Sequence, residues 1–130
     1  MITILQPPGW ARPKGFSHGI SASGKLVFIA GQVGMTGQGQ WNETSFAGQF
    51  RQALQNILAI LAQAKGRPEH IVRLTWFVLD KQEYLNSLKA VGEAYRELMG
   101  RHYPAMAVVQ VSGLVEDEAR LEIEATAVIP

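Results

Sequence analysis

The fold prediction starts from two stretches near the end of the chain, residues 103–111 (YPAMAVVQV) and 121–128 (LEIEATAV). Both are rich in residues that favour β-strands, and the short Ser/Gly/Glu/Asp segment between them is typical of a turn. We therefore expect the two stretches to pair as a hairpin. Glu122 and Glu124 are two residues apart on one strand, so both carboxylates should lie on one face, which Gln110 could share.

This pair of carboxylates has two interpretations. Carboxylates about 7 Å apart could act as acid and base if burial raised the pKa of one of them. Alternatively, they belong to a solvated strand face and form ion pairs with Arg73 or Arg120. Spacing alone favours the second interpretation, because structural charge pairs are commoner than catalytic ones.

The composition indicates one globular domain that spans residues 1–130. The chain is 47% hydrophobic and 18% charged, which is too apolar for disorder and leaves few charges to cover a lone small domain, so it hints at an oligomer. Twelve Lys/Arg residues balance eleven Asp/Glu residues without a basic run, which argues against a nucleic-acid partner. No stretch resembles a signal peptide or a membrane span, so no membrane association is expected.

The sequence implies no metal and no cofactor. The three histidines are isolated from one another, without the spacing of a metal site. The glycine-rich residues 31–37 lack the Gly-Lys-Ser/Thr ending of a phosphate-binding loop. The absence of cysteine excludes disulfides and thiolate chemistry, and it suits a reducing, cytoplasmic location.

The first third of the chain alternates irregular segments with short strands. Residues 1–15 contain three prolines and predict an extended N-terminal arm. Residues 17–21 and 25–30 predict two strands joined by a Ser-Gly turn, which we expect to form a hairpin. Residues 34–40 alternate glycine with small polar residues and predict a loop.

Two helices flank the most apolar strand. Apolar residues recur at helical spacing from Phe46 to Ala64 and again between Asp80 and Gly100, where Asp80 and Glu83 resemble a capping box. The predicted order is therefore β-β-α-β-α-β-β. Residues 71–79 between the helices carry large apolar groups on both faces. Helices can cover only one of these faces, so the other predicts contact with another subunit.

Five blocks of sequence resemble the Rid family, which is also called the YjgF or L-PSP endoribonuclease group. The resemblance implies an α+β, chorismate-mutase-like fold with a mixed sheet and two helices on one face. It also implies a homotrimer whose sheets form a central barrel, with three clefts between subunits that bind a small molecule. The blocks are residues 24–32 (GKLVFIAGQ), 52–57 (QALQNI), 71–78 (IVRLTWFV), 103–105 (YPA) and 121–125 (LEIEA).

The resemblance also implies a reaction, but one residue of this chain differs from those that the reaction uses. Family members of the deaminase type hydrolyse enamines and imines to ammonia and a 2-keto acid, and an arginine after Pro-Ala holds the substrate carboxylate. That position is Met106 here, and a thioether supplies neither charge nor a bidentate hydrogen bond. Hydrolysis of typical 2-imino acids is therefore disfavoured, unless Arg101, His102 or an arginine of a neighbouring subunit replaces the missing group.

Four further positions have lost the polar residue that the family implies. Only Glu122, whose family counterpart positions the attacking water, and the backbone of Gly31 match. The resemblance assigns the remaining site positions to Phe16 for a tyrosine, Ala30 for a serine, Gly92 for an asparagine and Val108 for a cysteine.

Three functions follow as hypotheses. The first is a divergent hydrolase or deaminase in which Glu122 activates water against an imine, enamine or related C–N bond of an apolar, uncharged substrate. The second is a trimeric module that binds a metabolite or a protein without chemistry, its cleft having become structural. The third, a ribonuclease, is disfavoured by the near-neutral charge and by the lack of a His/Lys catalytic grouping.

Overall fold

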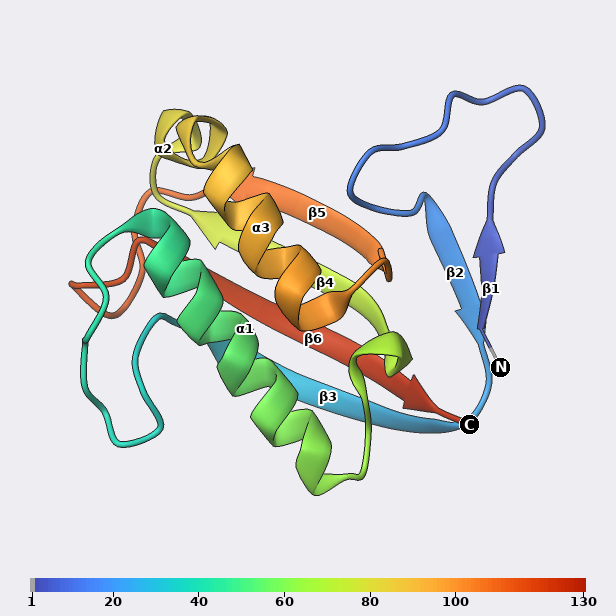
Figure 1. Ribbon diagram of the computed structural model, residues 1–130, viewed down its shortest axis with the longest axis horizontal. Coiled ribbons are helices and arrows are strands. Elements are labelled where there is room, and N and C mark those ends of the chain that lie inside the picture. The colour runs from blue at the N-terminus through green and yellow to red at the C-terminus, as the bar shows by residue number, and fades with distance from the viewer. Residues whose placement is uncertain (1) are drawn as a thin grey trace.

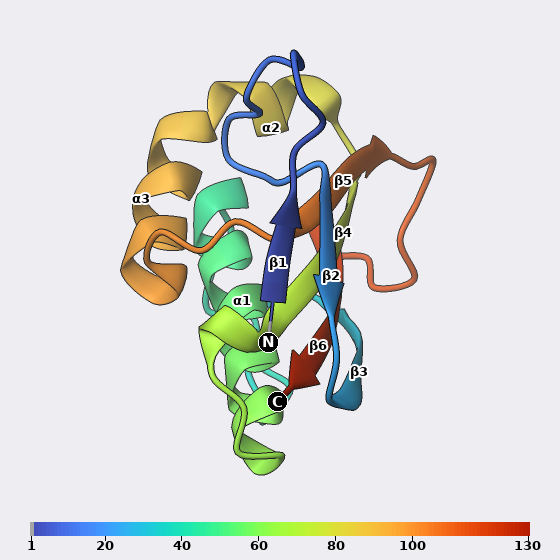
Figure 2. The same cartoon turned by 90° about the vertical axis from the view of Figure 1, so that its right-hand side faces the viewer.

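A computed structural model describes residues 2–130 of the chain (Figure 1), so Met1, the first residue of the expected arm, lies outside the described residues. The structure confirms an α+β fold in which the helices cover one face of a mixed sheet (Figures 1 and 2). The elements are β1 (Ile2–Leu5), β2 (Gly19–Ala22), β3 (Lys25–Gln32), α1 (Phe46–Gln63), η1 (Pro68–His70), β4 (Ile71–Val78), α2 (Lys81–Asn86), α3 (Leu88–Met99), β5 (Ala105–Gln110) and β6 (Leu121–Ile129).

The main sheet has the strand order β3-β6-β4-β5, so the expected pairing of residues 103–111 with 121–128 is wrong. β4 lies between these strands, parallel to β5 and antiparallel to β6. The reason is the apolar character of β4, whose Leu74, Trp76 and Val78 are buried. A strand of this kind is best placed inside the sheet, where both of its edges are paired and one face meets the helices.

The expected hairpin between residues 17–21 and 25–30 is also wrong. β2 pairs instead with β1, in a register that places Leu5 opposite Gly19, so part of the expected arm is a strand. This small sheet lies beside the main sheet rather than continuing it (Figure 1). Ser17 connects the two sheets, because its Oγ donates to the Tyr103 carbonyl at 2.5 Å and its N–H donates to the Pro104 carbonyl at 3.1 Å.

The first predicted helix is confirmed, whereas the second is divided. α1 begins after Ser45, whose Oγ accepts from the Gly48 N–H at 3.0 Å, and its apolar stripe is buried. Ser87 separates α2 from α3 and donates its hydroxyl to the Glu83 carbonyl at 2.8 Å. Asp80 caps α2 as expected, but the Glu83 carboxylate forms an ion pair with Arg120 instead of completing the capping box.

The hydrophobic core lies between the helices and the sheet, where Phe50 of α1 stacks on Trp76 of β4 with ring centroids 4.8 Å apart. Within residues 2–130, no helix lies over the opposite face (Figure 2). Leu26 is 59% exposed and Phe28 is 76% exposed on β3, and Val109 of β5 is also exposed. Among residues 2–130, no helix is long and apolar enough to cross a membrane, and no group of three or more His, Cys, Asp or Glu side chains could hold a metal ion.

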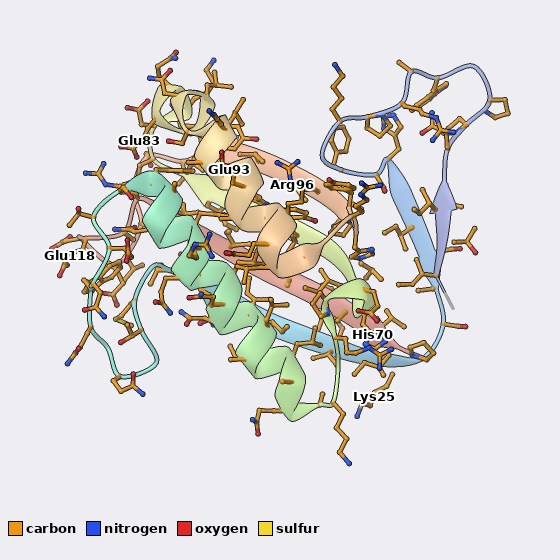
Figure 3. The ribbon with its side chains drawn as sticks, viewed as in Figure 1. Lys25, His70, Glu83, Glu93, Arg96 and Glu118 are labelled. Carbon is orange, nitrogen blue, oxygen red and sulfur yellow. The ribbon has the colours of Figure 1, made fainter. Side chains whose placement is uncertain are left out.

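Gln49 is a buried polar side chain that connects α1 to the segment before β6. Its Oε1 accepts from the Arg120 N–H at 2.8 Å, and its Nε2 donates to the carbonyls of Glu118 at 2.9 Å and Glu43 at 3.2 Å. Figure 3 shows Glu118 in the loop that leads to β6. Gln49 therefore satisfies three backbone groups and helps to place the first residues of β6.

We expect Gln49→Ala to lower the free energy of unfolding by about 1–3 kcal/mol, because it removes three partly buried hydrogen bonds to backbone groups. Urea denaturation followed by circular dichroism measures this change. Gln55→Ala is the matched control, since Gln55 lies on α1 with an exposed side chain and should change stability little. Equal effects of the two substitutions would contradict the role of Gln49.

Candidate functional site

The predicted site residues separate onto opposite faces of the main sheet. Met106 and Val108 of β5 lie in register with Leu74 and Trp76, which face the helices. On β6, Glu122 lies in register with Phe77, on the uncovered face. Because successive side chains of a strand point to opposite faces, the sheet itself separates Glu122 from Met106 within one chain.

The first part of the site is a cavity of about 430 Å³ on the helix face, between α3, β5 and the segment before β2. It brings together four of the predicted positions: Phe16, Gly92, Met106 and Val108. Sequence reasoning did not identify the other side chains on which the chemistry of the cavity depends. These are the aromatic residues Trp76, Tyr84, Tyr95 and Tyr103 and the cationic residues Lys14 and Arg96.

The aromatic residues form a rigid wall. Tyr95 and Tyr103 are stacked with an interplanar angle of 6°, and the Tyr95 hydroxyl donates to the His102 carbonyl at 2.5 Å. Burial raises the pKa of Tyr95 well above its ordinary value, with a smaller contribution from Tyr103, and burial also raises the pKa of Tyr84. These two hydroxyls therefore stay neutral at physiological pH, and neither places a negative charge in the cavity.

The second part of the site is a hollow of about 540 Å³ at the end of β3, which contains Gly31 and Glu122. Asn56 of α1 fixes the loop around it, since its Nδ2 donates to the Met35 carbonyl at 2.7 Å. A Cβ atom at Gly31 would overlap the Glu122 carboxylate, so the backbone of Gly31 lies directly against that group. Ala30 is exposed on β3 and does not line this hollow.

The surroundings of the two glutamates differ in part from the expectation. Within the described residues, neither Glu122 nor Glu124 forms a salt bridge, and Arg120 pairs with Glu83 at 2.5 Å. The two glutamates share one face as predicted. Gln110 does not join them, because it lies in register with Val78 and its Oε1 accepts from the Lys81 N–H at 2.7 Å.

The histidines make structural contacts away from either glutamate. His18 packs edge-on between Trp10 and Phe16, with ring centroids 5.1 and 5.7 Å away. His70 Nδ1 accepts from the Arg67 N–H at 2.9 Å, and His102 Nε2 lies 2.6 Å from the Ile71 carbonyl oxygen. His102 is in the loop after α3.

Helical spacing could have identified one of the residues that sequence reasoning missed. Leu88, Gly92 and Arg96 follow one another at intervals of four residues on α3, so they share one side of the helix, and all three line the cavity. The expected position of Gly92 in the site therefore also implied Arg96. The tyrosines carried no comparable signal, because their place in the wall depends on how α3 packs against β4.

The family model described as Endoribonuclease L-PSP matches residues 10–129. TdcF of Escherichia coli (strain K12), provisionally named a reactive intermediate deaminase, is 33% identical over 98% of this chain and 95% of its own length. The 2-iminobutanoate/2-iminopropanoate deaminase of the same strain is 32% identical over 81% of this chain and 80% of its own length.

Solved structures share the fold over nearly the whole chain. YyfB of Yersinia pestis, a Rid-family protein described as having unknown function, superposes with a TM-score of 0.86 at 28% identity and covers 98% of each chain. Escherichia coli TdcF with bound serine superposes with a TM-score of 0.70 at 30% identity, over 98% of this chain and 99% of TdcF.

We expect Gly31→Ala to displace the Glu122 side chain while leaving the fold intact, because the added methyl group meets the end of a flexible side chain. A crystal structure of the variant measures the displacement, and thermal unfolding should change little. Gly37→Ala is the control, since no atom lies within 4 Å of the place where its Cβ would stand. A Glu122 carboxylate in an unchanged position would contradict this prediction.

Proposed function

The chain belongs to the Rid family, whose model carries the description Endoribonuclease L-PSP, and on this premise we propose that it hydrolyses a small imine, enamine or related C–N bond in a cleft between subunits. The names of two relatives, a reactive intermediate deaminase and a 2-iminobutanoate/2-iminopropanoate deaminase, support this class of reaction. Glu122 is the proposed catalytic residue.

The observation that carries the proposal is the division of the site between the two faces of the sheet. One chain presents an apolar cavity around Met106 on one face and a carboxylate, Glu122, on the other. A complete cleft therefore needs the Glu122 face of one copy beside the Met106 cavity of another. The uncovered apolar face with Leu26 and Phe28 supports such an assembly, which we propose to be a homotrimer.

The proposed chemistry uses one water molecule. Glu122 accepts a proton from this water as the oxygen attacks the carbon of the C=N bond, and the proton then passes to nitrogen. The hydroxyl proton of the resulting carbinolamine then passes to its nitrogen, and the C–N bond breaks, which releases ammonia as the oxygen forms the carbonyl group. The Gly31 backbone lies directly against the Glu122 carboxylate, because glycine has no side chain to separate the two.

The walls of the cavity determine the proposed substrate. Met106 and Val108 on the strand side are apolar, so a carboxylate placed beside them would lose its hydration without gaining a partner. We therefore propose a substrate without a carboxylate on the carbon of the reacting C–N bond. Typical 2-imino acids carry their carboxylate at that carbon and should be poor substrates.

We expect the chain to form a homotrimer of three times its 14.3 kDa mass, and Phe28→Asp to dissociate it, because a carboxylate would be buried at the interface. Sedimentation velocity measures the masses of both proteins. Leu85→Asp is the control, since Leu85 is also exposed but lies on α2, on the helix side. A monomeric wild-type protein would overturn the proposed assembly.

We expect Glu122→Gln to reduce turnover of imines at least about 100-fold, because the amide cannot accept the proton of the attacking water. The assay measures ammonia released from imines that lack a carboxylate on the reacting carbon, generated in place by an amine oxidase. Glu124→Gln is the matched control, two residues away on the same face, and should retain activity. Unchanged turnover in Glu122→Gln would remove Glu122 from the mechanism. If the wild-type protein binds such compounds without releasing ammonia, it is a binding module instead.

The same assay tests the interpretation of Met106. Met106→Arg should raise kcat/KM for 2-iminopropanoate by about tenfold or more, because a guanidinium can pair with its carboxylate. Met106→Leu keeps the site apolar and should leave this reaction slow. Efficient hydrolysis of 2-iminopropanoate by the wild-type protein would show that another residue already replaces the missing arginine.

A further inference from the structure

The cavity beside α3 carries positive charge without a matching negative charge. Among the described residues that line it, Lys14 and Arg96 are the charged ones, and no Asp or Glu side chain takes part. Both cations are exposed, and neither side chain forms a hydrogen bond or an ion pair within the described residues. They are therefore available to an anionic group of a ligand.

Arg96 lines the cavity together with Gly92. It follows Gly92 by four residues, one turn along α3, and lies on the same side of the helix. Nothing lies within 4 Å of the place where a Cβ of Gly92 would stand, so this stretch of the helix wall is open. Figure 3 shows Arg96 on the side of α3 toward the N-terminal segment, which supplies Lys14 and Phe16 to the opposite wall.

We propose that Arg96, with Lys14 as a second cation, binds the anionic group of an aromatic or similarly apolar molecule. The rings of Tyr84, Tyr95 and Tyr103 contact the apolar body of this molecule, as their place in the wall of the cavity allows. The inference rests on the proposed function, because the bound molecule is the substrate of the same cleft.

The positions of Arg96 and Lys14 indicate where on the substrate the anionic group lies. The strand wall with Met106 and Val108 is apolar, whereas Arg96 and Lys14 come from the helix and from the N-terminal segment. An anionic group held by these cations is therefore separated from the strand wall. The substrate is a C–N compound whose anionic group is separated from the reacting carbon by an apolar, preferably aromatic, spacer. This differs from both a 2-imino acid and an uncharged ligand.

The experiment compares the binding of phenylbutyrate with that of phenylbutyramide, which has the same shape and no charge. Isothermal titration calorimetry on the wild-type protein should give at least about tenfold tighter binding of the acid, with a difference that decreases as salt increases. Arg96→Gln should abolish the preference, and Arg96→Lys should retain part of it. Lys89→Gln, which removes one exposed charge from the same helix outside the cavity, should bind like the wild type.

Equal affinities for the acid and the amide, or absence of acid binding, would overturn the inference. An acid preference that survives Arg96→Gln would overturn it as well. Because both probes are inert, this outcome is independent of turnover. A protein that fails here but still releases ammonia in a Glu122-dependent manner keeps the proposed function and loses only the inference. Conversely, if the acid binds through Arg96 but no ammonia is released, the anion site is supported and the proposed enzymatic function is wrong.

Discussion

The alternation of side chains on β4 is the constraint on which the rest of the structure depends. Leu74, Trp76 and Val78 point to the helices, while Thr75 and Phe77 point to the uncovered face. The register of β5 and β6 with β4 places their side chains on the same two faces in alternation. A shift by a single residue would exchange the faces of every side chain on the moved strand. The separation of Met106 from Glu122 therefore follows directly from the packing of the core.

The sequence predicted the helices and strands better than it predicted which strands pair with each other. The buried stripe of α1 and the two-sided apolar strand β4 were both readable, because each follows from the spacing of residues within one segment. Both expected hairpins failed, since a turn-like segment indicates that the chain reverses but not which strand it then pairs with. Gln110 illustrates the consequence, because a wrong partner for its strand also assigned its side chain to the wrong face.

The same limit applies to the site. Resemblance to the Rid family identified Phe16, Gly92, Met106 and Val108, and these positions do line one cavity. The lack of polar side chains at these four positions could be read directly from the sequence, because it concerns residue types alone. The aromatic wall could not, because Tyr84 and Tyr95 face the cavity only through the rotation of α2 and α3 against β4. The separation of these four positions from Glu122 equally required the strand order.

In the proposed site, a cation at position 96 would hold a ligand differently from an arginine at position 106. A guanidinium at position 106 would lie partly buried beside Leu74, where its desolvation must be offset by a paired carboxylate. Arg96 remains hydrated at the rim of the cavity, so it costs little when the site is empty but also gains less from each ion pair. Affinity must then come mainly from apolar contact, at roughly 25 cal/mol for each Å² buried. In the proposed anion site the aromatic wall would supply that contact, which would favour a bulky ligand over a small imino acid.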